Sequence, residues 1–401
     1  MSAVVVTGLG VTASTGLGLE DYWAATRVGR TGIRPITRFD ASGYPAGLAG
    51  EVPGFVPGDH LNDRILAQTD QLTRFALVAA DWALADAGLK PDDLPEFDMG
   101  VVTASSSGGF AFGQGELENL WRRGSQYVSA YQSFAWFYAV NTGQISIRHG
   151  MRGPSGVLVT DQAGGLDALA QARRRVRQGT PVMVSGGMDA SICPWGWVAQ
   201  LAGGRLSLAT EPDRAYLPFD ALARGYVPAE GGAILVVEDL VHARRRGVQP
   251  YGEIAGYAAT VDPRPGSGRP TTLRRAIANA LADAGMSPAD VDVVFADGAG
   301  RPGDDRAEAD AIAALFGSEG VPVTVPKAGA GRLCSGAGAL DVATALLALR
   351  DGVIPPTANV VPDPGYALDL VTEARPAPLR TALVLARGVG GFTAAMLVRS
   401  L

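Results

Sequence analysis

The chain is poor in cysteine and histidine, with two Cys and three His among its 401 residues. Two cysteines, Cys193 and Cys334, cannot build a disulfide framework, and without a CxxC or Cys/His cluster we expect no metal site. Long apolar runs are also missing, because no uncharged stretch reaches the about 20 residues that a membrane helix needs. The first residues lack the basic start and apolar core of a signal peptide. We therefore expect a cytoplasmic protein that does not bind membranes.

Positive charge is in deficit, since 34 Lys and Arg against 40 Asp and Glu give a net charge of −6. An acidic chain of this kind is a poor candidate for binding nucleic acid. Two basic runs, at 173–177 and 244–246, stand out against that background. We expect them to be solvated helix faces, with a docking patch for an acidic protein as the alternative.

What the chain does contain is an alternation of short apolar runs with longer helical patterns. Strands are predicted at 4–7, 100–104, 157–160, 182–185, 233–238, 291–296, 321–325, 382–386 and 394–398. Continuous apolar strands separated by amphipathic helices indicate sheets that are covered on both faces. The sequence therefore predicts an α/β fold.

Two parts of the chain repeat each other. Residues 83–88 and 280–285 both read Ala-Leu-Ala-Asp-Ala-Gly, and a proline-containing turn and a strand pattern follow each copy. A second pair, Gly-Leu-Asp-Ala at 165–168 and Ala-Leu-Asp-Val at 339–342, opens a helix in each part. Two matches in the same order favour an internal duplication. We predict two similar halves, residues 1–245 and 246–401.

Residues 156–168 have the pattern of a nucleophile elbow, in which a strand, a tight turn and a helix of small residues follow one another. The turn presents Gln162, whose amide can donate and accept hydrogen bonds but cannot act as a nucleophile. Two further glycine-rich turns follow strands and carry Asp297 and Arg332. Neither turn has the spacing of a phosphate-binding loop.

These turns, with Pro-Phe-Asp at 218–220, Glu-Gly at 230–231 and Gly-Val-Gly-Gly-Phe at 388–392, resemble the β-ketoacyl synthases along the whole chain. The resemblance implies a thiolase-like fold of two duplicated halves in five α-β-α-β-α layers. Condensing members have Cys where this chain has Gln162, and His where it has Asp297 and Arg332. We therefore expect no catalytic residue, because the thiolate and both imidazoles are absent. An Asp297–Arg332 ion pair and two solvent-facing side chains are the alternatives at these positions.

The stretches 131–150 and 162–168 are similar to the chain length factor, or KSβ, of bacterial type II aromatic polyketide synthases, of the actinorhodin type. The resemblance implies an obligate heterodimer with a catalytic ketosynthase, KSα, and a tunnel for a poly-β-ketone built from malonyl units. It implies no cofactor of its own, because the substrate arrives on a phosphopantetheinyl acyl carrier protein bound mainly to the partner. Two alternatives are a malonyl-carrier decarboxylase acting through Gln162 and a catalytically dead scaffold.

The same resemblance implies which residues close the end of the tunnel. Phe110, Gly113 and Leu117 stand at i, i+3 and i+7 of a predicted helix, and with Phe134 they are expected to gate the tunnel. Octaketide factors carry bulkier residues at the positions of Gly113 and Leu117. We therefore expect a longer product, a decaketide in the first place and a dodecaketide in the second.

Aromatic side chains crowd the stretch 131–138. Four of them, Tyr131, Trp136, Phe137 and Tyr138, are expected at the KSα interface, because interface cores are rich in aromatic residues. The alternative is a buried aromatic element of the chain's own core.

Overall fold

Each half of the chain contributes five main strands in the same spatial order. The computed structural model describes residues 3–264 and 266–401. In the N-terminal half the order is β6-β5-β7-β8-β1, and in the C-terminal half it is β11-β10-β15-β16-β9. In both orders the first two pairings are parallel and the next two antiparallel. A short β1–β9 pairing joins the halves into one sheet.

The strands of the N-terminal half are β1 (Val4–Ala13), β5 (Met99–Ala104), β6 (Ser155–Leu158), β7 (Val182–Asp189) and β8 (Gly231–Asp239). Those of the C-terminal half are β9 (Gly252–Val261), β10 (Val293–Phe295), β11 (Pro322–Thr324), β15 (Thr381–Arg387) and β16 (Phe392–Arg399). Short strands are β2 (Gly16–Leu17), β3 (Ile33–Pro35), β4 (Leu48–Gly50), β12 (Val353–Ile354), β13 (Asp369–Leu370) and β14 (Arg375–Pro376).

The longer helices are α1 (Leu19–Thr26), α3 (Gln71–Asp86), α4 (Phe110–Arg123), α6 (Val140–Arg148), α7 (Gly164–Arg177), α8 (Pro194–Ala202), α10 (Leu273–Ala284), α11 (Pro302–Phe316) and α13 (Ser335–Asp351). Single turns or little more are α2 (Asp63–Leu66), α5 (Gln132–Ala135), α9 (Leu240–Arg245) and α12 (Lys327–Ala330). Within the described residues, no helix is both long and apolar enough to cross a membrane.

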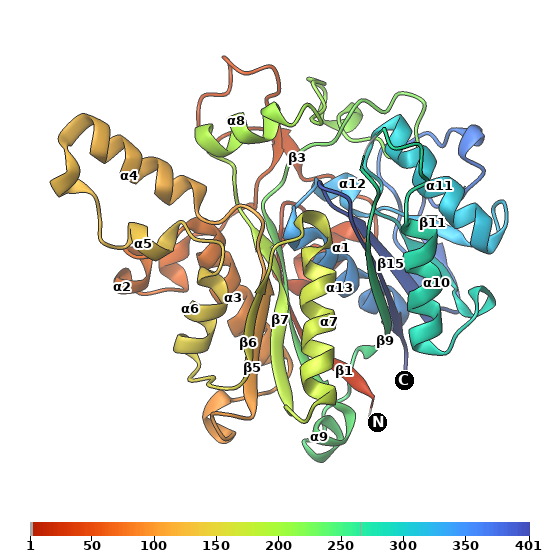
Figure 1. Cartoon of the computed structure of the whole chain (residues 1–401), viewed down its shortest axis with the longest axis horizontal. Helices are drawn as coiled ribbons and strands as arrows, with labels where there is room; N and C mark the ends of the chain where they lie inside the picture. The colour runs from red at the N-terminus through yellow and green to blue at the C-terminus, as the bar shows by residue number, and fades with distance from the viewer. Residues whose placement is uncertain (1–2, 265) are drawn as a thin grey trace.

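Five layers follow from how the helices cover the strands (Figure 1). Helices α7 and α13 pack on each other between the two sets of strands, while α3 covers the outer side of the N-terminal set and α10 that of the C-terminal set. Helix α13 is buried on every side from its first residue to Leu349, as its Ala- and Leu-rich sequence demands. The predicted thiolase-like fold with five layers is confirmed.

The sequence repeat is also a repeat of backbone packing. Gly8 in β1 lies so close to α3 that a Cβ atom would stand 2.1 Å from the carbonyl oxygen of Ala83. Gly256 in β9 lies in the same way on α10, where a Cβ atom would stand 2.3 Å from the carbonyl oxygen of Ala280. Only glycine permits this approach of strand to helix, so the duplication constrains both halves in the same place.

The aspartates of the two copies also correspond. Asp86 accepts a hydrogen bond from the backbone N–H of Leu9 (2.8 Å), and Asp283 accepts one from that of Tyr257 (2.9 Å). The two aspartates differ in one respect. Asp283 also forms an ion pair, in which its carboxylate lies 2.6 Å from the guanidinium of Arg173. Arg173 is buried, so the expectation of a solvated face for the whole run 173–177 was wrong at this residue. The ion pair with Asp283 holds the Arg173 side chain inward across the seam between the halves.

One long strand escaped the sequence prediction. Strand β9 reads Gly-Glu-Ile-Ala-Gly-Tyr-Ala-Ala-Thr-Val and pairs with β16 along its whole length. Its many Ala and Gly residues have low strand propensity, so the pattern was not recognised. Tertiary pairing, with α10 on its other side, fixes it as a strand.

Candidate functional site: a degenerate catalytic centre

Gln162 stands at the turn before α7, in a short 3₁₀ segment over Asp161–Ala163. Asp161 has φ of 51°, a left-handed backbone that a non-glycine residue adopts at a cost of about 1–3 kcal/mol. Its carboxylate accepts a hydrogen bond from the backbone N–H of Val389 at 2.7 Å, which helps to hold the turn. The elbow geometry is therefore present, and its presented side chain is 3% exposed.

The amide of Gln162 is engaged with the backbone of Cys334. With the amide oriented so that both of its groups have partners, Nε2 donates to the Cys334 carbonyl at 3.3 Å and Oε1 accepts from the Cys334 N–H at 3.1 Å. Cys334 itself has φ of 48° and ψ of −129°, so a second strained residue faces the elbow. The contact satisfies polar groups that would otherwise be buried without partners. Gln162 thus ties the start of α7 to the start of α13.

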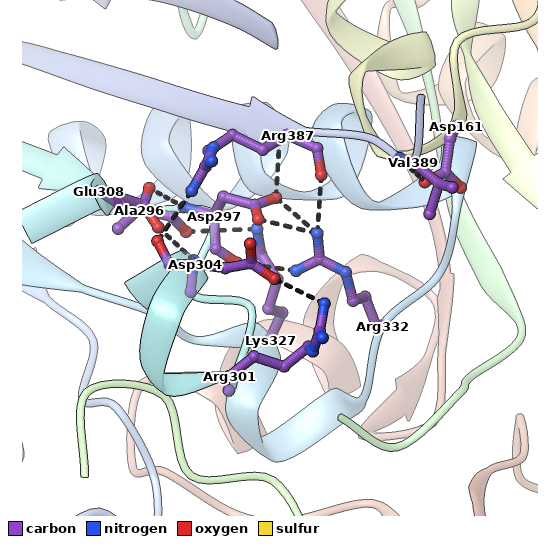
Figure 2. A network of polar contacts seen from close by, with 12 residues as sticks. Asp161, Ala296, Asp297, Arg301, Asp304, Glu308, Lys327, Arg332, Arg387 and Val389 are labelled. Carbon is purple, nitrogen blue, oxygen red and sulfur yellow. Dashed lines mark hydrogen bonds and ion pairs between the residues drawn. The ribbon is translucent and has the colours of Figure 1, made fainter. Parts of the chain in front are cut away.

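Asp297 and Arg332 form a buried ion pair beside this turn (Figure 2). Asp297 follows β10, and Arg332 lies between α12 and α13. One nitrogen of the guanidinium, Nη2, lies 2.8 and 3.0 Å from the two carboxylate oxygens, and Nη1 donates to the Asp297 carbonyl at 3.2 Å. The structure therefore shows the ion pair and excludes two solvent-facing side chains, since both residues are buried.

Neighbouring charges complete this network. Lys327 forms an ion pair with Asp341 and donates to the carbonyl of Ala296 at 3.3 Å. Glu308 accepts hydrogen bonds from the backbone N–H groups of Asp297 and Gly298, at 2.7 and 2.9 Å. The described structure thus surrounds each buried charge with donors or acceptors, as burial of charge requires.

The end of β15 and the residues that follow it link the ion pair to the elbow. The backbone N–H of Arg387 donates to the Asp297 carboxylate at 3.0 Å, and its carbonyl accepts from Arg332 at 2.9 Å. Two residues on, Val389 bonds to Asp161. Gln162, Asp297 and Arg332, which we call the degenerate centre, are therefore held in one place by the loop 387–389.

The electrostatics of the degenerate centre keep Asp297 and Arg332 charged. Burial acts to raise the pKa of Asp297, but the Arg332 and Lys327 charges outweigh it and hold that pKa below its usual value. Burial likewise opposes the charge of Arg332, yet Asp297 raises the Arg332 pKa well above its ordinary value. Burial raises the pKa of Asp341 to about 6 in spite of Lys327. At neutral pH the Asp297–Arg332 pair stays ionised.

Cys334 is the residue here that sequence reasoning passed over. Its backbone is the partner of Gln162, and its thiol accepts from Gln200 Nε2 at 3.9 Å. Burial raises the pKa of this thiol well above its usual value, so it stays protonated and is a poor nucleophile. Its place in a glycine-rich turn, two residues after Arg332, was the available signal. The degenerate centre therefore offers neither an activated thiolate nor an imidazole for acyl transfer.

The expected gate residues lie on a part of the molecule that projects from the layers. Phe110, Gly113 and Leu117 lie along α4, which is helical as predicted, and Phe134 lies in the neighbouring α5 (Figure 1). Gly113 is buried and Leu117 is exposed. The structure thus brings the four residues to one projecting region.

The aromatic segment, defined as Tyr131, Trp136, Phe137 and Tyr138, is exposed in the isolated chain. Each of these side chains keeps 39–45% of its surface in contact with solvent. A buried core element is therefore excluded. Contiguous exposed aromatic surface is typical of a face that another protein covers.

Comparison with known proteins identifies the setting of this centre. Residues 1–243 match the model of the β-ketoacyl synthase N-terminal domain, and residues 251–361 that of its C-terminal domain. The chain belongs to the β-ketoacyl synthase family. That Gln162, Asp297 and Arg332 take the positions of the family's catalytic cysteine and two histidines stays a prediction from the sequence.

Within this family the chain groups with the beta subunits of type II polyketide synthases. It is 62% identical to the "Actinorhodin polyketide putative beta-ketoacyl synthase 2" of Streptomyces coelicolor, over 99% of this chain and 98% of the relative. It is 59% identical to the "Tetracenomycin polyketide synthase ketoacyl synthase beta subunit" of Streptomyces glaucescens, over 99% and 98%. A solved structure, "The ishigamide ketosynthase/chain length factor", is similar with a TM-score of 0.91 at 30% identity, over 100% and 99% of the two chains.

Proposed function

We propose that this chain is the non-nucleophilic subunit of a KSα/KSβ heterodimer that makes a poly-β-ketone from malonyl units on an acyl carrier protein. The observation that carries the proposal is the degenerate centre, in which the Asp297–Arg332 ion pair and the Gln162–Cys334 contact fill the catalytic positions. Condensation needs a thiolate to hold the acyl chain, and this chain supplies none. The chemistry then belongs to the partner, which also receives the carrier's phosphopantetheine arm.

Two features of the surface support association with a KSα partner. Strand β6 is the last strand of its sheet and, among the described residues, pairs with β5 alone, so its outer edge is free to add a strand. The aromatic segment supplies the apolar surface that obligate interfaces bury, commonly more than about 2,000 Å² in total. A catalytic ketosynthase with the same fold would meet both features across an approximate two-fold axis.

The projecting α4 supports a role in chain length. Phe110, Gly113 and Leu117 follow one another along this helix, with Phe134 from α5 beside it. In the proposed heterodimer these residues wall the far end of the tunnel that leads from the KSα cysteine. When the growing chain fills that tunnel, elongation stops. The modest size of Leu117 favours a product longer than an octaketide, with a decaketide first and a dodecaketide second.

The test is co-expression with the cognate KSα and carrier protein, followed by mass analysis of the products. We expect a one-to-one complex, and we expect Leu117→Phe to shorten the chain by one or more two-carbon units, because a larger ring occupies the tunnel end. The matched control is Leu222→Phe, the same substitution at an exposed residue of the segment between α8 and β8. A monodisperse monomer, or an unchanged product length at full yield, would contradict the proposal.

A further inference from the structure

The space that Gly113 leaves open is filled from another helix. A Cβ atom at Gly113 would lie 3.0 Å from Cζ3 of Trp195 and 3.5 Å from Cβ of Trp136. The first distance is shorter than an ordinary carbon–carbon contact of about 3.5–4.0 Å. The absence of a side chain at Gly113 therefore creates no void at this point, because the Trp195 ring already lies there.

Trp195 is fixed against α4 at two further points. Its backbone N–H donates to Oε1 of Gln114 at 2.9 Å. Its ring meets that of Phe110 edge-on, with centroids 4.9 Å apart and planes at 78°, a favourable aromatic geometry. Trp195 follows Pro194 in the first turn of α8, so its backbone is also held by the helix. Phe110, Gly113 and Trp195 thus form one packed unit that spans α4 and α8.

Two tryptophans of α8 differ in what they face. Trp197 is fully buried, and its indole N–H donates to the carbonyl of Ala46 at 2.9 Å, as a core residue requires. Trp195 is 38% exposed, and its indole N–H donates no hydrogen bond to any residue that the structure describes. A donor on an exposed aromatic ring suits a ligand with an apolar body and oxygen acceptors.

We propose that Trp195 is a further chain-length determinant, acting with Gly113 as a matched pair. The inference rests on the proposed function, in which α4 walls the polyketide tunnel. Gly113 is small because Trp195 occupies its side-chain space, and Trp195 sets the reach of the tunnel on the α8 side. The ligand is the end of the growing poly-β-ketone, whose keto oxygens accept from the indole N–H and whose carbon chain packs on the ring.

The experiment uses the complex of the full chain with its KSα and carrier protein, and measures product length by mass. Trp195→Ala removes the ring, so the product should lengthen by at least one two-carbon unit. Trp195→Phe keeps a ring and removes the N–H, so length should be kept while yield falls several-fold. Val198→Ala, at an exposed position one turn along α8, is the control and should leave both unchanged.

The pairing is tested by combination. Gly113→Thr alone should lower the yield by tenfold or more, because its side chain collides with Trp195. In the Trp195→Ala background the same change should restore yield and return the product length toward that of the native complex. If Trp195→Ala does not assemble with KSα, Trp195→Leu replaces it with the same expected lengthening.

The following outcomes would overturn the inference. Native product length at native yield with Trp195→Ala or Trp195→Leu would show that the ring does not wall the tunnel. Equal losses for Gly113→Thr in both backgrounds would show that the two residues are not coupled. If Leu117→Phe shortens the product while the Trp195 variants do not change it, only this inference fails. If none of these variants changes the length, the gate in the proposed function fails as well.

Discussion

At the turn after β10 the chain buries a carboxylate and a guanidinium, whereas around α5 it leaves four aromatic rings in contact with solvent. This distribution is the reverse of ordinary folding, in which charge stays outside and aromatic residues pack inside. The degenerate centre has its polar partners within the chain, whereas the aromatic segment keeps 39–45% of each side chain exposed in spite of ring contacts such as that of Phe137 with Tyr138. The first region is therefore complete in the isolated chain, while the second needs another protein.

The difference shows how a catalytic fold can be converted to another use. Loss of a nucleophile leaves a polar pocket, and an unfilled polar pocket is costly. Here Gln162 binds the backbone of Cys334, and Arg332 neutralises Asp297, so the pocket is satisfied without chemistry. The exposed surface is then free to serve association and tunnel shape.

The largest effect is expected when one member of the buried pair is removed. Arg332→Leu leaves the Asp297 carboxylate buried without its main partner, which should lower the free energy of unfolding by about 3–5 kcal/mol. The double variant Asp297→Asn with Arg332→Leu removes the charge as well and should recover most of that loss. Denaturant unfolding of the two variants and the native complex measures the loss of stability in the single variant and its recovery in the double variant. Equal destabilisation by the single and the double variant would show that charge is not the cause.

The pH dependence of that loss has a definite sign. In native protein the pKa of Asp297 is depressed, so its stabilising effect is present at neutral pH and is lost only as the pH falls through the folded value. In Arg332→Leu the largest opposing charge is removed and Lys327 remains, so we expect burial to raise the folded pKa of Asp297 above the unfolded value of about 4. The ionised form then carries the penalty. The stability gap between the variant and the native protein should shrink as the pH falls from 7 toward 4.

The next effect concerns the exposed region. Replacing Trp136 and Phe137 with serine removes apolar surface that the proposed function offers to KSα. We expect the heterodimer to weaken by about 2 kcal/mol or more, which is about 30-fold in Kd, as for aromatic residues at interface hot spots. Phe97→Ser, at an exposed residue before β5, is the control. Undiminished pairing in a titration by light scattering would remove the aromatic segment from the interface.

The two regions were not equally readable from the sequence. The repeated Ala-Leu-Ala-Asp-Ala-Gly and the strand-turn-helix of the elbow are local patterns, and the structure places both as expected. The inward turn of Arg173 was not readable, because Asp283 lies 110 residues away along the chain. The contact of Trp195 with Gly113 was missed for the same reason, since α4 and α8 meet only in the fold. The sequence indicated these local elements, but not which distant side chains pack against them.

The smallest effect is expected when the missing nucleophile is returned. Gln162→Cys restores a thiol at the elbow, but the neighbouring positions still hold the Asp297–Arg332 pair in place of two imidazoles. Burial would raise the thiol pKa, as it does for Cys334, and a protonated thiol is a weak nucleophile. We expect no condensation by this variant when it is paired with a KSα whose own cysteine is replaced by alanine. Intact mass after incubation with malonyl-carrier protein, and product analysis, measure acyl loading and turnover. Sustained condensation would mean that Asp297 or Arg332 performs the work of a histidine, and the degenerate centre would have to be regarded as a dormant catalytic site.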